Sequence, residues 1–148
     1  MKEYFQDLIF IEEENACKVK ESRDVKEIVI PETFNGKPVT SIGPWALAGS
    51  DNLEKVTIPK SVTEICGNAF AGCNALKSVI VPRSVVKIGN VAFGGCASLT
   101  IYCEAENLPR DWNAIWNSWN RPVFWYSETK PEKSGNFWHY VNGKVTEW

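Results

Sequence analysis

One twelve-residue phrase occurs twice in the chain, and it constrains the fold more than any other feature. ICGNAFAGCNAL spans residues 65–76 and IGNVAFGGCASL spans residues 88–99, so the two copies start 23 residues apart. A looser copy, IGPWALAGSDNL, lies at residues 42–53. Agreement at a fixed period of this length is typical of stacked units, none of which buries its apolar side alone. The sequence therefore predicts a solenoid.

Each unit also contains a β-branched run that ends at a proline: IVIP at 28–31, VTIP at 56–59 and VIVP at 79–82. Alternation with period two predicts a strand, and the proline cannot donate to a continuing ladder. A second short extended piece is expected at 61–65 and at 84–88. The next phrase places Ala and Phe between glycines, which predicts a single helical or 3₁₀ turn.

The repeated pattern carries a family resemblance. LEKVTIPKSVTEICGNAFAGC and LKSVIVPRSVVKIGNVAFGGC, within residues 25–105, resemble the BspA-like leucine-rich repeat family. The resemblance implies an α/β solenoid: a short right-handed coil with a parallel sheet on its concave side and short helical turns. Members of that family are commonly bacterial surface or secreted proteins that adhere to other proteins. The resemblance therefore implies a non-catalytic module for protein binding or adhesion.

The chain of 148 residues is expected to form a single leucine-rich-repeat domain that is capped at both ends. A solenoid exposes apolar core at each end unless something covers it. Residues 1–24 contain two alternating runs around an acidic turn, which predicts a hairpin cap. Residues 25–105 carry the repeats, and residues 106–148 form a tryptophan-rich C-terminal cap.

The C-terminal segment contains six of the seven tryptophans. Trp112, Ile115, Trp116 and Trp119 have helical spacing, and Asp111 is available as an N-cap, so a helix is expected there. A strand and a final hairpin that turns at Asn142-Gly143 should follow. The aromatic face either covers the last coil or forms a stacking platform for sugar rings, and carbohydrate binding by exposed tryptophans is the alternative function.

Composition excludes several classes of protein. The net charge of -2 and the pI near 5.5 argue against a nucleic-acid partner, which normally requires a basic surface. No segment approaches the roughly 20 apolar residues of a membrane span, and no signal peptide is visible at the N-terminus. Location stays open: the cytoplasm if the chain is complete, the cell surface or the medium by family resemblance.

The five cysteines are expected to be buried thiols. Cys66, Cys73, Cys96 and Cys103 look like two pairs of metal ligands, but six residues separate each pair, whereas zinc pairs usually have two to four. Cys73 and Cys96 instead occupy the same position of successive repeats. A disulfide between them is a geometric alternative, because neighbouring strands lie about 5 Å apart.

No catalytic or cofactor site emerges from the remaining chemistry-bearing residues. His139 is the only histidine, and no nucleophile or orienting carboxylate shows a local signature beside it. The run Glu12-Glu13-Glu14 is expected to be solvated and lacks a calcium-loop pattern. No glycine-rich phosphate loop follows a strand. We therefore expect no enzyme, no cofactor and no metal.

Alternation along the strands predicts which side chains are available for binding. Alternation divides the side chains of these strands into an inward set and two outward columns. The inward set is Ile28, Ile30, Val56, Ile58, Val79, Val81, Ile101 and Cys103; one outward column is Glu27, Lys55, Ser78 and Thr100, and the next is Val29, Thr57, Ile80 and Tyr102. Apolar members of these columns favour contact with a partner protein or a second copy of the chain. The alternative is that β-branched and aromatic residues are simply favoured in strands, and that their exposure indicates no partner. The candidate binding residues are Val29, Lys55, Thr57, Ser78, Ile80, Thr100 and Tyr102.

Overall fold

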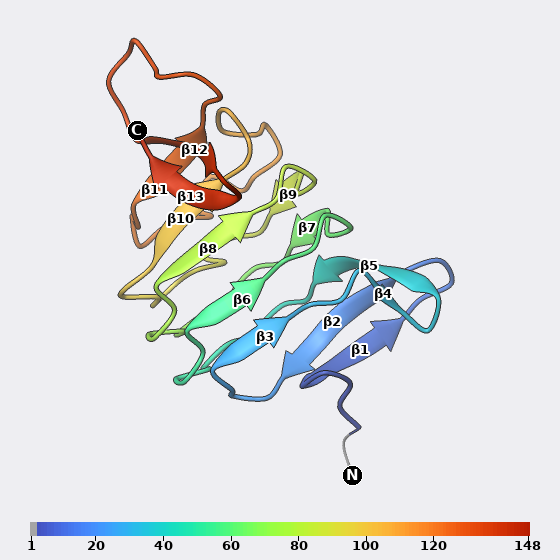
Figure 1. Cartoon of the computed structure of the whole chain (residues 1–148). Helices are drawn as coiled ribbons and strands as arrows, with labels where there is room; N and C mark the ends of the chain where they lie inside the picture. The colour runs from blue at the N-terminus through green and yellow to red at the C-terminus, as the bar shows by residue number, and fades with distance from the viewer. Residues whose placement is uncertain (1–2) are drawn as a thin grey trace.

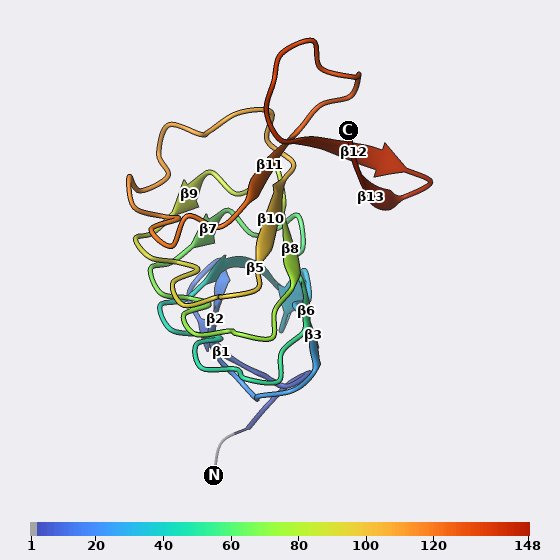
Figure 2. The ribbon, with the colours of Figure 1, turned by 90° about the vertical axis from the view of Figure 1, so that its left-hand side faces the viewer.

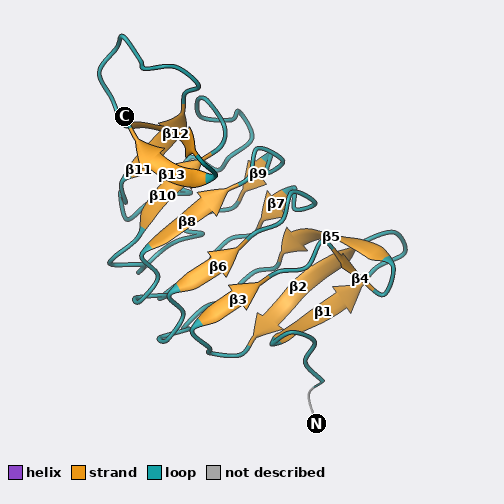
Figure 3. Ribbon diagram, in the orientation of Figure 1, coloured by secondary structure: helices purple, strands orange, loops and turns teal. Residues whose placement is uncertain are grey.

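The structure, a computed structural model, describes residues 3–148 as a β-solenoid that winds in successive coils from the N-terminus to the C-terminus (Figure 1). Within these residues every regular element is a strand (Figure 3). The strands are β1 (Leu8–Glu12), β2 (Cys17–Ser22), β3 (Glu27–Val29), β4 (Thr33–Phe34), β5 (Lys37–Ile42), β6 (Lys55–Thr57), β7 (Glu64–Ile65), β8 (Ser78–Val81), β9 (Lys87–Ile88), β10 (Thr100–Cys103), β11 (Val123–Tyr126), β12 (Phe137–Val141) and β13 (Lys144–Glu147).

The strands form three sheets, and stacking of coils makes most neighbours parallel. One sheet has the order β1-β2-β5-β7-β9, with β4 paired to β5; the second is β3-β6, and the third is β8-β10-β11-β12-β13. The antiparallel pairs are β1-β2, β4-β5 and β12-β13. Figure 2 shows β7 and β9 on one side of the solenoid and β6, β8 and β10 on the other. The core lies between these two sides.

Equivalent positions of successive coils stack on one another in the core. The rings of Phe70 and Phe93 are parallel to within 14°, with their centroids 5.2 Å apart. Alternation on the strands holds as expected, since the inward positions are buried. Those inward residues are Ile28, Ile30, Val56, Ile58, Val79, Val81, Ile101 and Cys103.

The expected short helical turns are wrong. Trp45, Asn68 and Val91 have φ of 60°, 60° and 55°, which breaks a right-handed helix at its start. Backbone N–H groups of these segments alternate between two kinds of acceptor: Phe70 N donates to Ala92 O of the next coil at 2.9 Å, and Ala71 N donates to Asn68 O of its own turn at 3.0 Å. Isolated turns joined by bonds between coils therefore stand where a continuous helical turn is expected.

The parallel sheet of the predicted binding side is interrupted. β3 pairs with β6, and β8 pairs with β10, but β6 and β8 belong to different sheets. In the part of the chain that the structure describes, no backbone hydrogen bond joins Lys55–Thr57 to Ser78–Val81. The sheet is open at this point.

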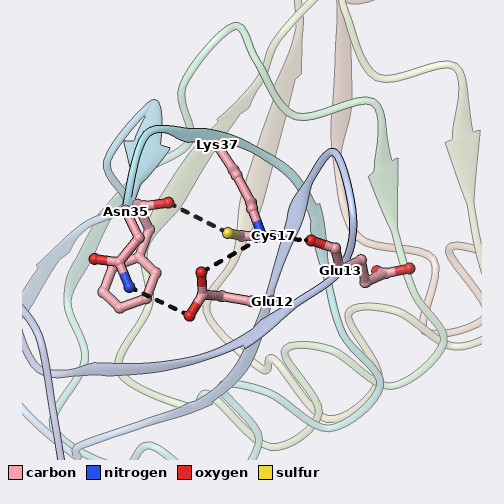
Figure 4. A network of polar contacts seen from close by, with 6 residues as sticks. Glu12, Glu13, Cys17, Asn35 and Lys37 are labelled. Atoms are coloured by element: carbon pink, nitrogen blue, oxygen red, sulfur yellow. Dashed lines mark hydrogen bonds and ion pairs between the residues drawn. The ribbon is translucent and has the colours of Figure 1, made fainter.

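The N-terminal hairpin is fastened to the β4–β5 hairpin by polar contacts (Figure 4). Lys37 Nζ donates to the carbonyl oxygen of Glu13 at 2.8 Å and lies 3.7 Å from a carboxylate oxygen of Glu12. Asn35 Nδ2 donates to the same carboxylate at 3.2 Å. The acidic run is thus partly used to dock this hairpin.

The expected helix at residues 111–119 is also absent, and the segment forms turns that continue the coil. Asn113 N donates to Ile88 O at 2.8 Å, and Val91 N donates to Ile115 O at 3.0 Å. Trp112 and Trp116 are buried, whereas Ile115 and Trp119 are exposed. The tail therefore stacks as a further coil before β11 adds to the third sheet. No helix in residues 3–148 has the length and apolar character to cross a bilayer.

Candidate functional site

The seven predicted binding residues lie on the outer side of β3, β6, β8 and β10. Register places Val29 beside Thr57 and Ile80 beside Tyr102 on neighbouring strands. The exposure of these residues falls along the row. Val29, Lys55, Thr57 and Ser78 are exposed, and Ile80, Thr100 and Tyr102 are half-buried.

A groove with a volume of about 320 Å³ lies where β6 and β8 part. Solvent reaches the core side chains there: Val56 and Ile58 are each 7% exposed, against 1% for Val79 and Val81. The groove is lined by Lys55, Val56, Thr57, Ile58, Lys60, Ser78, Val79, Ile80, Pro82, Glu104 and Tyr140.

The C-terminal hairpin forms one wall of this groove. β12 and β13 extend from the solenoid on the outer side of the sheet that contains β8 and β10 (Figure 2). Tyr140, on β12, donates its hydroxyl to Glu104 Oε2 at 2.7 Å, and both residues line the groove. The predicted binding side therefore contains a groove with a wall, where the sequence predicts an open row of exposed side chains.

The same hairpin packs on Tyr102. The tyrosine hydroxyl donates to Glu147 Oε2 at 2.6 Å, and its ring lies 5.7 Å from the indole of Trp138. Burial and this hydrogen bond raise the pKa of Tyr102 to about 12, since both favour the neutral phenol. The chain itself thus occupies the side of Tyr102 that sequence reasoning left for a partner.

A second recess adjoins the groove and shares two of its lining residues. Its volume is about 410 Å³, and it is lined by Arg83, Glu104, Tyr126, Glu128 and Tyr140. Glu104 and Tyr140 line both the groove and the recess, and the hydrogen bond between the two residues separates the two hollows. The recess combines aromatic walls with carboxylates on the exposed side of the sheet.

Two residues of this recess are recognisable in the sequence as departures from the repeat. Register aligns Cys103 with Val81, so Glu104 stands where the two preceding coils have Pro59 and Pro82. In the next coil Tyr126 follows Trp125, which aligns with Cys103. A polar or an aromatic residue thus replaces, in the last two coils, the proline that follows the strand in the earlier ones. No departure from the repeat indicates that Tyr140 lies beside Glu104 and Tyr126.

The tail tryptophans mostly cover the core. Trp112, Trp116 and Trp138 are buried, and Trp112 Nε1 donates to Val85 O at 3.2 Å. Trp119 is 59% exposed, while Trp148 is 45% exposed and stacks on His139 with ring centroids 3.7 Å apart. Buried indoles offer no face to a sugar. Trp125 is half-buried and packs against the core, so the exposed tryptophans available for a sugar platform in the tail are Trp119 and Trp148.

The cysteines are free thiols, and four of the five are buried. Cys73 Sγ donates to Leu47 O at 3.1 Å, and Cys96 Sγ donates to Phe70 O at 3.0 Å, so each bonds to the coil before it. Burial raises the pKa of Cys103. Across residues 3–148 no three His, Cys, Asp or Glu side chains gather as a metal site would require.

Comparisons with known proteins identify the family. The model of the BspA-type leucine-rich repeat region, in six copies, matches residues 16–110. A leucine-rich cell surface protein from Faecalibacterium prausnitzii is 33% identical, with a TM-score of 0.60; the match covers 68% of this chain and 30% of that one. A leucine-rich repeat protein from Bacteroides capillosus shares the fold at 22% identity and a TM-score of 0.50, over 69% and 97% of the two chains.

No curated protein matches the sequence. The chain spans less than a third of the Faecalibacterium protein. The matched repeat region nevertheless covers more than half of the present chain, and the solved relatives are bacterial leucine-rich repeat proteins. The recurring columns, the parallel ladders and this match agree. The chain belongs to the BspA-type leucine-rich repeat family.

Proposed function

We propose that this chain is a non-catalytic protein-binding module whose binding site is the groove between β6 and β8. The observation that carries the proposal is the open sheet, which leaves a hollow of about 320 Å³ beside the half-buried side chain of Ile80. A gap in a sheet exposes both apolar core and unpaired backbone groups. Protein partners recognise such a combination through side-chain insertion and hydrogen bonds.

The shape of the groove favours an extended protein segment. Tyr140 and Pro82 supply apolar surface on one side, and Lys55 and Lys60 supply charge on the other. Apolar residues at the centre and charged residues at the rim are the usual anatomy of a protein interface. In this proposal the outer side of β3, β6, β8 and β10 is the concave recognition side that the family resemblance implies, and Val29 lies outside the contact.

A role in adhesion at the cell surface follows from the same proposal. It is supported by the likeness to the Faecalibacterium protein, which is described as a leucine-rich cell surface protein. Repeat solenoids offer an extended face for such contacts. The residues that we expect to contact the partner are Thr57 and Ile80, with Lys55 and Ser78 at the edges of the groove.

Photo-cross-linking tests this proposal directly. A benzoylphenylalanine side chain placed at Thr57, beside the groove, should cross-link one protein from a bacterial cell-surface extract. The same side chain at Val86, which is 59% exposed and absent from the groove lining, should not. Cross-linking of the purified chain alone, with a product of doubled mass, would identify a second copy as the partner.

Competition by unlabelled variants shows whether the partner contacts the groove or other residues on the outer side of β3, β6, β8 and β10. Wild-type protein and Val29→Gln should both suppress the cross-link, because Val29 lies on the same side but outside the groove. Ile80→Gln should compete poorly. Equal competition by Ile80→Gln, or equal cross-linking from residues 57 and 86, would contradict the proposal.

A further inference from the structure

Two tyrosines from different strands form the walls of the recess beside the groove. The ring centroids of Tyr126, on β11, and Tyr140, on β12, lie 6.1 Å apart at an angle of 46°. The buried indole of Trp138 packs edge-on against both rings, at 5.4 Å and 4.8 Å. Because Trp138 holds the walls from behind, the V-shaped opening between them is set before any ligand arrives.

The recess contains more negative than positive charge. Its lining includes the carboxylates of Glu104 and Glu128 and one cation, Arg83. The guanidinium of Arg83 donates to the backbone carbonyl oxygen of Glu104 at 3.1 Å rather than to a carboxylate. Among the ion pairs of the described residues, none includes either carboxylate. Both acids therefore lack a cationic partner.

Neutral donors hold these two carboxylates in place. Tyr140 donates to Glu104 Oε2, the backbone N–H of Arg83 donates to Glu104 Oε1 at 3.0 Å, and Tyr126 donates to Glu128. The pKa of Tyr140 is raised by burial and by its bond to Glu104, and that of Tyr126 by its bond to Glu128. The phenols are neutral donors at neutral pH, so their bonds add no positive charge, and Arg83 is the one cation of the lining beside two carboxylates.

Aromatic faces beside carboxylates select organic cations. A cation over a tyrosine face is attracted by the ring quadrupole, and the chain already places a guanidinium carbon 5.8 Å from the Tyr126 centroid. A bare metal ion would need more oxygen ligands than the two carboxylates offer, and an anion would meet net negative charge. The chemistry of the site thus fits the head of an arginine or lysine side chain.

We propose that this recess binds a basic side chain, arginine or lysine, from the protein segment that occupies the adjoining groove. The proposal rests on the function proposed above. Glu104 and Tyr140 line both hollows, so one extended segment passes from the groove to the recess without crossing a barrier other than their hydrogen bond. In this proposal the partner is recognised by two neighbouring residues of its segment: a basic residue in the recess and an apolar residue in the groove.

Titration with a small probe tests the recess without a partner. N-acetyl-arginine N-methylamide is added to the full chain, and the ring resonances of Tyr126 and Tyr140 are followed by NMR. Saturable shifts in the millimolar range are expected. The neutral isostere, N-acetyl-citrulline N-methylamide, should give no saturable shift, because it has the same shape without the charge. Equal binding of the two probes, or no saturable shift with arginine, would overturn the proposal.

Variants localise the binding. Glu128→Gln removes a charge with little change of shape and should weaken the arginine probe about two- to fivefold. Tyr126→Leu removes a wall and should have an effect of about the same size. Glu132→Gln alters an exposed carboxylate that lines only a neighbouring hollow and should bind as wild type. A Glu128→Gln variant that binds like Glu132→Gln would contradict the assignment.

The test of the recess can fail or succeed independently of the cross-linking test of the groove. Ile80→Gln should bind the arginine probe like wild type, because Ile80 lines only the groove. Probe binding without any specific cross-link at Thr57 would leave the recess standing and remove the proposed function. A specific cross-link without probe binding would do the reverse.

Discussion

The indole nitrogen of Trp138 donates a hydrogen bond to the carbonyl oxygen of Cys103 at 2.8 Å, although the two residues are 35 positions apart. Trp138 is fully buried, and this bond joins the C-terminal hairpin to the last strand that retains the repeat pattern. The hairpin in turn supplies Tyr140 to both hollows. Removal of this anchor should therefore affect binding as well as stability.

Replacement of Trp138 tests the anchor. Trp138→Ala should lower the free energy of unfolding by about 3–5 kcal/mol, because it leaves a large cavity. Trp138→Phe keeps much of the volume but leaves the Cys103 carbonyl without its donor, which should cost about 1–3 kcal/mol. Urea unfolding measures both losses. Equal stability of Trp138→Phe and wild type would mean that the hydrogen bond contributes nothing.

Two tail tryptophans should behave differently. Trp112→Ala removes a buried ring from the core, so the expected loss of stability is about 3–5 kcal/mol. Trp119→Ala removes a ring that is mostly exposed and should change stability by no more than about 0.5 kcal/mol. Thermal unfolding of the two variants measures the change in stability that each substitution causes. Loss of a polysaccharide-dependent fluorescence change in the intact Trp119→Ala variant would instead support the sugar platform.

Val91 is a strained position at which a substitution should stabilise the protein. Its φ of 55° is costly for a β-branched side chain, whereas Asn68 occupies the equivalent position of the preceding coil at φ of 60°. Val91→Asn should raise the free energy of unfolding by about 1 kcal/mol. Val86→Asn, at an exposed residue without positive φ, serves as the control and should bring no gain.

Thiol labelling should distinguish Cys66 from the other cysteines. Cys66 is partly exposed, and the remaining four are buried. Iodoacetamide should modify one thiol in the folded chain and five after denaturation. Burial also raises the pKa of Cys66, so its labelling should be slow and should accelerate as pH rises. Mass spectrometry of the peptides provides the count. Labelling of Cys73 at the same rate would contradict the buried position of that thiol.

Alkaline pH should weaken the contact between the hairpin and Tyr102. The ordinary phenol pKa is 10.0, and in the folded chain that of Tyr102 is raised to about 12. The stability that this shift represents is present below pH 10 and is lost as pH rises from 10 to 12, because the unfolded chain then releases a proton that the folded chain retains. Tyr102→Phe should reduce the slope of unfolding free energy against pH in this window. An unchanged slope would show that Tyr102 does not titrate there.

Much of the coil could be predicted from the sequence, since the repeat encodes it locally. Alternation along Ile28 to Ile30 and Val79 to Val81 identified the buried side, because the side-chain period of a strand is two residues. The predicted helical turns failed for an equally local reason. Left-handed backbone at Asn68 and the bonds from Phe70 to the next coil replace a helix, and spacing alone does not distinguish the two.

The sequence by itself determined the period, the inward columns and the family, because each depends on residues that are near one another and recur. Only the tertiary structure decided that the sheet opens between β6 and β8, and that Tyr140 meets Glu104 and Tyr126. The position of Tyr140 depends on where Trp138 packs, since Trp138 joins the C-terminal hairpin to Cys103 and contacts the Tyr140 ring. That packing is settled by the shape of the assembled solenoid, to which residues far apart in the chain contribute, and no local pattern specifies it.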